Sequence, residues 1–141
     1  MRFVTRERLH VDRIATAWLI RRFIDSDATF AFVSRTEDLS GRADTPFDVR
    51  GAELSHCGER CTFEVACEKN ALTDPALQAM GLIIRGADLP YDESVAPEAA
   101  GVRAVFDAIR DGQESDEHRL EYGMPVCDAL YAYCRGRQLS P

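Results

Sequence analysis

The sequence predicts an α+β fold, in which one mostly helical domain carries a small β-sheet. Segments with apolar residues at helical spacing follow one another along most of the chain. One short segment, ATFAFVS at 28–34, alternates in the manner of a strand. The chain has 141 residues, of which 45% are hydrophobic. That length is most economically folded as a single domain covering residues 1–141.

The first helix is predicted over residues 12–25, DRIATAWLIRRFID, with Asp12 in position to cap its amino end. Its apolar side chains fall on nearly every side of the helical wheel, which is typical of a central, buried helix. Its three arginines must then reach solvent or find carboxylate partners. After the strand at 28–34, the segment PFDVR at 46–50 is a candidate strand to pair with it.

Five further helices are predicted from their starts and stops. One begins at Cys61 or Thr62, one follows the Asp74-Pro75 N-cap pair, and one begins at Pro97 and ends at Gly112. Ser115 caps a short helix that Gly123 and Pro125 interrupt, and a last helix runs from Pro125 to about Arg135.

Composition excludes several classes of function. The net charge of −7 repels phosphate backbones, so we expect no nucleic-acid binding by this chain alone. No apolar run is long enough to cross a bilayer, and no cleavage-like site follows the amino-terminal apolar stretch. Five cysteines are an odd number, which fits reduced thiols better than a disulfide framework. We therefore expect a cytoplasmic protein without a membrane partner. Whether it forms a homo-oligomer stays open.

Metal-competent side chains gather in GAELSHCGERCTFEVACEK, residues 51–69, which holds one histidine, three cysteines and four glutamates. His56 is the first candidate, because imidazole is the commonest neutral metal ligand. The CxxxC spacing of Cys57 and Cys61 matches zinc motifs only weakly, and Cys57 is more simply an exposed or half-buried thiol. Carboxylates with one imidazole suit manganese, iron or zinc better than a thiolate-rich cage does.

Two acidic residues have both a functional and a purely structural explanation. Glu64 follows His56 by eight residues and stands in the first turn of its helix, where the helix dipole favours a negative charge by roughly 0.3–1 kcal/mol. Asp88, in IIRGADLP, follows an apolar helix and is placed either to reach a cleft or to serve as a cap or turn residue. Both alternatives stay open for both residues.

The order of several longer motifs resembles the chromate-resistance (ChrB-type) domain family over roughly residues 3–135. These motifs are VDRIATAWLIRRFID, PFDVRGAELSHCGERCTFE, IIRGADL, PEAAGV and DALYAY. Members of that family occur alone, fused to rhodanese-like domains, or as the carboxy-terminal part of longer chromate-responsive regulators with an additional amino-terminal region. The resemblance therefore implies a role in chromate stress, but we expect no DNA-binding role for this chain alone.

The resemblance carries over residue by residue. The family motifs match His56, Glu64, Asp88 and Asp48, and from the chemistry of these side chains we expect His56 and Glu64 to bind a divalent metal ion (manganese, iron or zinc), with Asp88 and Asp48 completing or orienting the shell. The same motifs contain Asp12, Arg13 and Cys61, which we assign to binding an anion or substrate, with a small oxyanion as the candidate ligand.

Our leading hypothesis is a metal-binding domain for the sensing of, or defence against, chromate or metal-oxyanion stress. Two alternatives differ in what they predict. A metal-dependent hydrolase or redox enzyme would use the same side chains around an open coordination position. A structural or partner-binding module without metal would place His56 and Glu64 in different surroundings and would not respond to chelation.

Overall fold

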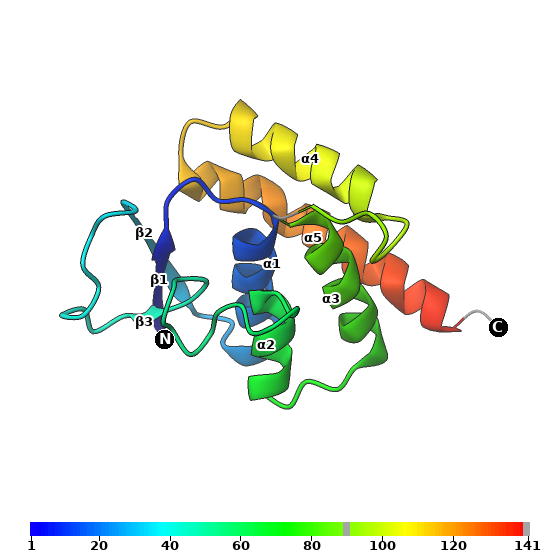
Figure 1. Cartoon of the computed structure of the whole chain (residues 1–141), viewed down its shortest axis with the longest axis horizontal. Helices are drawn as coiled ribbons and strands as arrows, with labels where there is room; N and C mark the ends of the chain where they lie inside the picture. The colour runs from blue at the N-terminus through cyan, green and yellow to red at the C-terminus, as the bar shows by residue number, and fades with distance from the viewer. Residues whose placement is uncertain (89–90, 140–141) are drawn as a thin grey trace.

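The computed structural model describes residues 1–88 and 91–139, and it confirms the α+β fold (Figure 1). Its strands are β1 (Arg2–Arg6), β2 (Thr29–Val33) and β3 (Thr45–Pro46). Its α-helices are α1 (Val11–Leu19), α2 (Thr62–Lys69), α3 (Pro75–Ala87), α4 (Ala99–Gly112) and α5 (Asp116–Leu139). None of the helices in these two ranges combines the length and the apolar character that crossing a membrane requires.

The sheet is parallel, with strand order β2-β1-β3. The strand predicted at 28–34 is present as β2. The predicted pairing of 46–50 with it is wrong, because β1 lies between β2 and the two-residue β3. β1 escaped sequence analysis because arginines begin and end its five residues, although Phe3, Val4 and Thr5 between them are buried. The loop that follows β3 holds one of the candidate site residues, Asp48.

α1 is the central helix, as its apolar sequence predicts (Figure 1). Eight of its nine residues are buried, and it packs against α2, α3 and α5. The predicted continuation to residue 25 is present as a π-helical turn, Ile20–Ile24. The predicted cap is wrong: α1 begins at Val11 and Asp12 lies inside the first turn. The carboxylate of Asp12 is thereby free to serve the neighbouring helix.

The predicted starts of α2 and α3 are confirmed, with the side chain of Asp74 accepting a hydrogen bond from the backbone of Ala76 at 2.8 Å. The predicted interruption near Gly123 is wrong, because α5 continues through Pro125. A Cβ atom on Gly123 would lie 2.4 Å from Cγ2 of Ile14. This glycine therefore allows the close approach of α5 to α1, which fixes the position of the first turn of α1.

Candidate functional site

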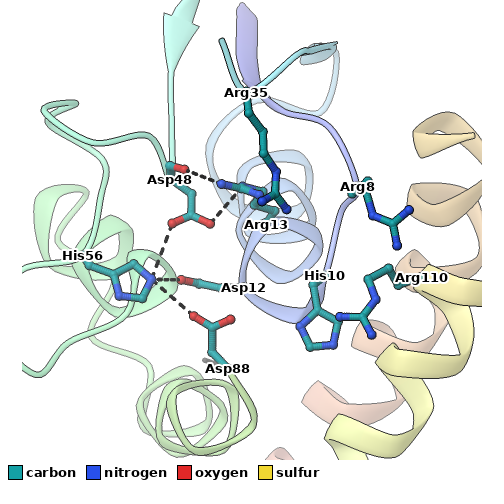
Figure 2. Close-up of a pocket in the computed structure, with 9 residues that line it drawn as sticks. All are labelled: Arg8, His10, Asp12, Arg13, Arg35, Asp48, His56, Asp88 and Arg110. Atoms are coloured by element: carbon teal, nitrogen blue, oxygen red, sulfur yellow. Dashed lines mark hydrogen bonds and ion pairs between the residues drawn. The ribbon is translucent and has the colours of Figure 1, made fainter. Parts of the chain in front are cut away.

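Four side chains from four separate segments meet at one side of the molecule (Figure 2). Asp12 comes from α1, Asp48 from the loop after β3, His56 from the loop before α2, and Asp88 from the end of α3. The Nε2 atom of His56 lies 2.9 Å from Oδ2 of Asp12, 3.5 Å from Oδ1 of Asp48 and 3.3 Å from Oδ2 of Asp88. We call these four residues the acidic centre.

Asp12 is the buried member of the acidic centre, with a side chain only 1% exposed. Its carboxylate accepts hydrogen bonds from the backbone N–H groups of Thr62 at 2.9 Å and Phe63 at 3.0 Å. These are the first two residues of α2, whose N–H groups have no partner within their own helix. The hydroxyl of Thr16 donates a further bond at 3.3 Å. Asp12 therefore holds the start of α2 while it contacts His56.

Asp48 is fixed in an unusual backbone conformation with φ of 49°. Its backbone N–H donates to the carbonyl of Leu54 at 2.7 Å, and its Oδ1 accepts from the hydroxyl of Thr62 at 2.8 Å. The Nε atom of Arg13 lies 3.2 Å from Oδ2. Burial raises the pKa of Asp48, the charge of Asp12 adds to the effect, and Arg13 opposes it. A left-handed non-glycine residue at this place costs free energy that the surrounding bonds must offset.

His56 is the half-exposed member, with 46% of its side chain accessible. Hydrogen bonds to Asp12 and Asp88 raise the pKa of His56 to about 10, against the lowering effect of partial burial. In the absence of another cation the imidazole is thus protonated at neutral pH. Asp88 ends α3 as its C-cap, where its backbone N–H donates to Ile84 at 3.0 Å. Its side chain reaches the centre, which is the functional alternative left open by the sequence.

The Nε2 atom of His56 carries at most one hydrogen, yet three carboxylates lie within 3.5 Å of it. One proton cannot make three well-directed hydrogen bonds. The observed separations of 2.9–3.5 Å match those between neighbouring ligands of an ion with bonds of ~2.0–2.2 Å. Among the described residues, one ligand atom each of Asp12, Asp48 and His56 lie within 4.8 Å of one another.

The charge balance of the acidic centre also favours a bound cation. Two unit negative charges 4–5 Å apart repel by about 3–4 kcal/mol at an effective dielectric constant of about 20. The three aspartates carry three such charges, of which Arg13 and a protonated His56 offset two. A divalent ion in place of the imidazole proton would offset the third. The donor set of carboxylate oxygens with one imidazole fits manganese, iron or zinc.

Glu64 does not join the acidic centre in the part of the chain that the structure describes. Its carboxylate lies 2.9 Å from Nε of Arg85 and accepts a hydrogen bond from the backbone N–H of Cys61 at 3.1 Å. This is the carboxylate half of a capping box at the start of α2. The structural alternative explains the position of Glu64, and its separation from His56 is what the module without metal predicts; the assignment of Glu64 as a metal ligand stays a prediction.

Cys61 is buried, and its thiol points toward Oε1 of Glu64 at 3.4 Å. Burial raises the pKa of this thiol well above its usual range. A buried, protonated thiol beside a carboxylate is poorly suited to bind an anion, so the position of Cys61 lends no support to its assignment as an anion-binding residue.

Arg13, which was assigned to the same role, forms an ion pair with the carboxylate of Asp48, as described above. The other predicted features of the cysteines hold: Cys57 is exposed, whereas Cys67, Cys127 and Cys134 are buried.

The acidic centre forms one wall of an open pocket of about 440 Å³. The pocket is also lined by Arg8, His10, Arg35 and Arg110 (Figure 2). None of these four is among the predicted site residues, because they come from the β1–α1 connection, the loop after β2 and the last turns of α4. Nothing in their local sequence marks them. Arg8 has a left-handed φ of 64°, so two of the three such non-glycine residues among those described line this pocket.

Comparisons with known proteins agree with the sequence motifs. The family model described as "ChrB, C-terminal domain" matches residues 3–134. A curated relative, Protein ChrB of Cupriavidus metallidurans, is 37% identical over 132 residues. The match covers 93% of this chain and 40% of the relative, so the chain spans less than half the length of that protein. No solved structure matches significantly.

Proposed function

This chain belongs to the family of ChrB carboxy-terminal domains, and from that premise we propose that it is a cytoplasmic metal-binding domain that serves in the sensing of, or defence against, chromate or related oxyanion stress. Family membership supports the role in chromate resistance. The five free cysteines, four of them buried, support a reducing compartment.

One observation carries the metal-binding part of the proposal: a single imidazole nitrogen lies within 3.5 Å of three carboxylates from three separate segments. Asp12 and Asp48 are further held by bonds from α2, so their positions do not depend on His56. A preformed set of this kind loses little conformational entropy when an ion binds. Asp12, Asp48 and His56 would hold the ion, with Asp88 as the fourth ligand or as a partner that orients His56.

A divalent ion at this place would supply a positive charge at the wall of the pocket. A net-negative protein needs such a local charge, or arginines, to retain a doubly charged oxyanion. The contribution of the protein is to fix the ligands and to leave the side facing the pocket open. Neither the geometry nor the comparisons favour the alternative of a hydrolase or redox enzyme.

The test is the metal content of protein purified without a histidine tag, measured by inductively coupled plasma mass spectrometry. We expect about one ion per wild-type chain and a loss of about tenfold or more in His56→Ala. The control is His118→Ala, because His118 is an exposed residue of α5 outside the acidic centre. Equal metal content in His56→Ala and His118→Ala would contradict the proposal.

The oxyanion part is tested separately by calorimetric titration of chromate into the metal-loaded protein. We expect a saturable heat of binding that is weaker in His56→Ala, because that variant lacks the metal, and unchanged in His118→Ala. A titration without heat, in protein shown to contain its metal, would argue against direct recognition of chromate and would leave the metal site standing.

A further inference from the structure

The pocket is lined, besides the acidic centre and Arg13, by Arg8, His10 and Arg110 across from the acidic centre and by Arg35 above Arg13 (Figure 2). We propose that Arg8, Arg35 and Arg110 form a separate subsite for a phosphate-type oxyanion group, a tetrahedral group with two negative charges. The inference rests on the proposed function only in placing this group beside a metal ion. The arginines themselves need no metal to bind an anion.

These arginines are not explained as counter-charges for the three aspartates. Arg13 fills that role through its contact with Asp48. In the described residues, Arg8, Arg35 and Arg110 make no ion pair with Asp12, Asp48 or Asp88. Arg8 and Arg110 contact Asp111 and Asp107 outside the pocket, and all three arginine side chains line it. Guanidinium groups match the geometry of phosphate-type oxygens by paired hydrogen bonds.

Arg35 shows the need for a ligand most directly. Its side chain is exposed, and within residues 1–88 and 91–139 its guanidinium has neither a hydrogen bond nor an ion pair. It lines the pocket from the loop after β2, above Arg13 in Figure 2. A guanidinium without a protein partner keeps its full capacity for an incoming anion.

Arg8 is held in place by its backbone. Its left-handed conformation, with φ of 64°, is disfavoured for a residue other than glycine. The carboxylate of Asp116 accepts hydrogen bonds from the N–H groups of Arg8 at 3.0 Å and Leu9 at 2.8 Å. Asp116 is itself buried and paired with Arg119 at 2.9 Å. Strain that is fixed by buried bonds in this way is typical of functional sites.

The side chain of Arg110 is oriented by two aspartates that lie outside the pocket. Its Nε donates to Asp111 at 2.9 Å, and its Nη2 lies 3.7 Å from Asp107. Asp107 also bonds the ring of His10 at 2.7 Å, and Asp111 lies 3.9 Å from Arg8. Both aspartates lie outside the residues that line the pocket, whereas the cationic side chains line it. Asp107 and Asp111 therefore reduce the positive charge of the arginines without occupying the surface of the pocket.

The pocket is larger than a bare oxyanion requires. Its volume of about 440 Å³ compares with ~30 Å³ per water molecule in the liquid, and a five-atom oxyanion fills the space of only about two or three waters. The group is thus either a free oxyanion accompanied by water or the charged end of a small organic molecule. The shared chemistry is the tetrahedral, doubly charged group, and the probes below distinguish the two sources.

The experiment is calorimetric titration of inorganic phosphate and, separately, ribose 5-phosphate into the full chain, with and without one equivalent of Mn²⁺. The variants are Arg35→Ala and Arg110→Gln. Neither substitution removes a backbone bond, and Arg35 has no protein partner to lose. The matched control is Arg135→Ala, which removes an exposed arginine of α5 whose guanidinium lies 5.9 Å from the ring of Tyr131, outside the pocket.

We expect each pocket variant to weaken anion binding by about tenfold, as the loss of one charge-assisted hydrogen bond predicts, and the control to leave it unchanged. Tighter binding of ribose 5-phosphate would identify a phosphorylated organic ligand, and binding of phosphate alone a free oxyanion. Both results support the subsite. Failure of both probes to bind, or equal affinity in all variants, would overturn it. Because anion affinity and metal content are measured separately, loss of metal in His56→Ala would stand even then.

Discussion

His56 and Glu64 belong to one motif, HCGERCTFE, yet the structure places them in opposite electrostatic situations. His56 meets three carboxylates with one proton to share among them. Glu64 meets one arginine and one backbone N–H, which together satisfy it. The partners of His56 come from α1, the β3–α2 loop and α3, whereas those of Glu64 come from α2 and α3 alone. Closeness in sequence therefore does not decide which residues share a site.

The two regions also differ in what they need. Around Glu64 the charges balance, so a bound ion would add nothing. Around His56 one negative charge remains when all three aspartates are ionised and Arg13 and the imidazolium are counted, so a cation would be stabilised there. The comparison thus predicts that substitutions in the acidic centre change metal binding, and that substitutions around Glu64 change stability alone.

The largest expected effect comes from Asp12→Ala, which should lower both the stability of the fold and the metal content. It leaves the buried N–H groups of Thr62 and Phe63 without their acceptor, at a cost of about 2–5 kcal/mol in the free energy of unfolding. It also removes one metal ligand. Urea unfolding and metal analysis measure the two losses. The less severe Asp12→Asn keeps an acceptor and lets metal content be measured in folded protein. Metal content at the wild-type level in Asp12→Asn would contradict a ligand role.

A smaller effect is expected from Glu64→Gln, which weakens the contacts to Arg85 and Cys61. Both side chains of the ion pair are partly buried, so we expect a loss of about 1–2 kcal/mol in the free energy of unfolding. Metal content should equal that of the wild type. If Glu64→Gln lost its metal as fully as His56→Ala, the distinction between the two halves of the motif would collapse.

A matched cycle sharpens this result. Arg85→Gln removes the other partner of Glu64, and the double variant shows how much of the loss belongs to the pair. We expect a coupling of about 0.5–1 kcal/mol between the two single substitutions. Purely additive losses would show that Glu64 acts through the cap at Cys61 and not through Arg85.

The smallest expected effect is a pH dependence of the free energy of unfolding in protein that a chelator keeps free of metal. The folded pKa of His56 is raised to about 10, above its unfolded value of about 6.5. The stability that the imidazolium contributes is therefore fully present below about pH 6.5 and is lost as the pH rises toward 10. In unfolding experiments with chelator, the difference between wild type and His56→Ala should shrink over this window. A difference that grows with pH would have the wrong sign.

The same proton affects metal affinity in the opposite direction. A metal ion must displace it from His56, so affinity should rise with pH, by at most about tenfold per unit for one proton released. Calorimetry in buffers of different ionisation enthalpy measures the number of protons released. Zero protons at pH 7 would mean that the ion does not bind at His56.

Local signals in the sequence predicted much of the fold. The Asp74-Pro75 pair marks the start of α3, and the helix beginning at Thr62 follows from its apolar spacing, because both depend on neighbouring residues. Asp12 shows where such signals end. Its partners are N–H groups about fifty residues away. The local sequence therefore predicts that Asp12 caps α1, whereas in the structure its carboxylate caps α2. Gly123 likewise has the local pattern of a helix break, but the close approach of Ile14 from α1 is what requires a glycine at this position.

The candidate site was predicted in part. The prediction that His56, Asp48 and Asp88 converge agrees with the structure, whereas Glu64, predicted with them, lies apart with Arg85. The other arginines of the pocket were not foreseen. Arg8, Arg35 and Arg110 come together only through the path of the β1–α1 connection and the packing of α4, which no spacing in the sequence describes.

Asp12 joins the pocket to the beginning of α2 through one carboxylate. A cation bound to this carboxylate would draw electron density from its oxygens and would thereby weaken the hydrogen bonds that they accept from Thr62 and Phe63. Filling of the pocket would therefore change the chemical shifts and the deuterium exchange of these two amides.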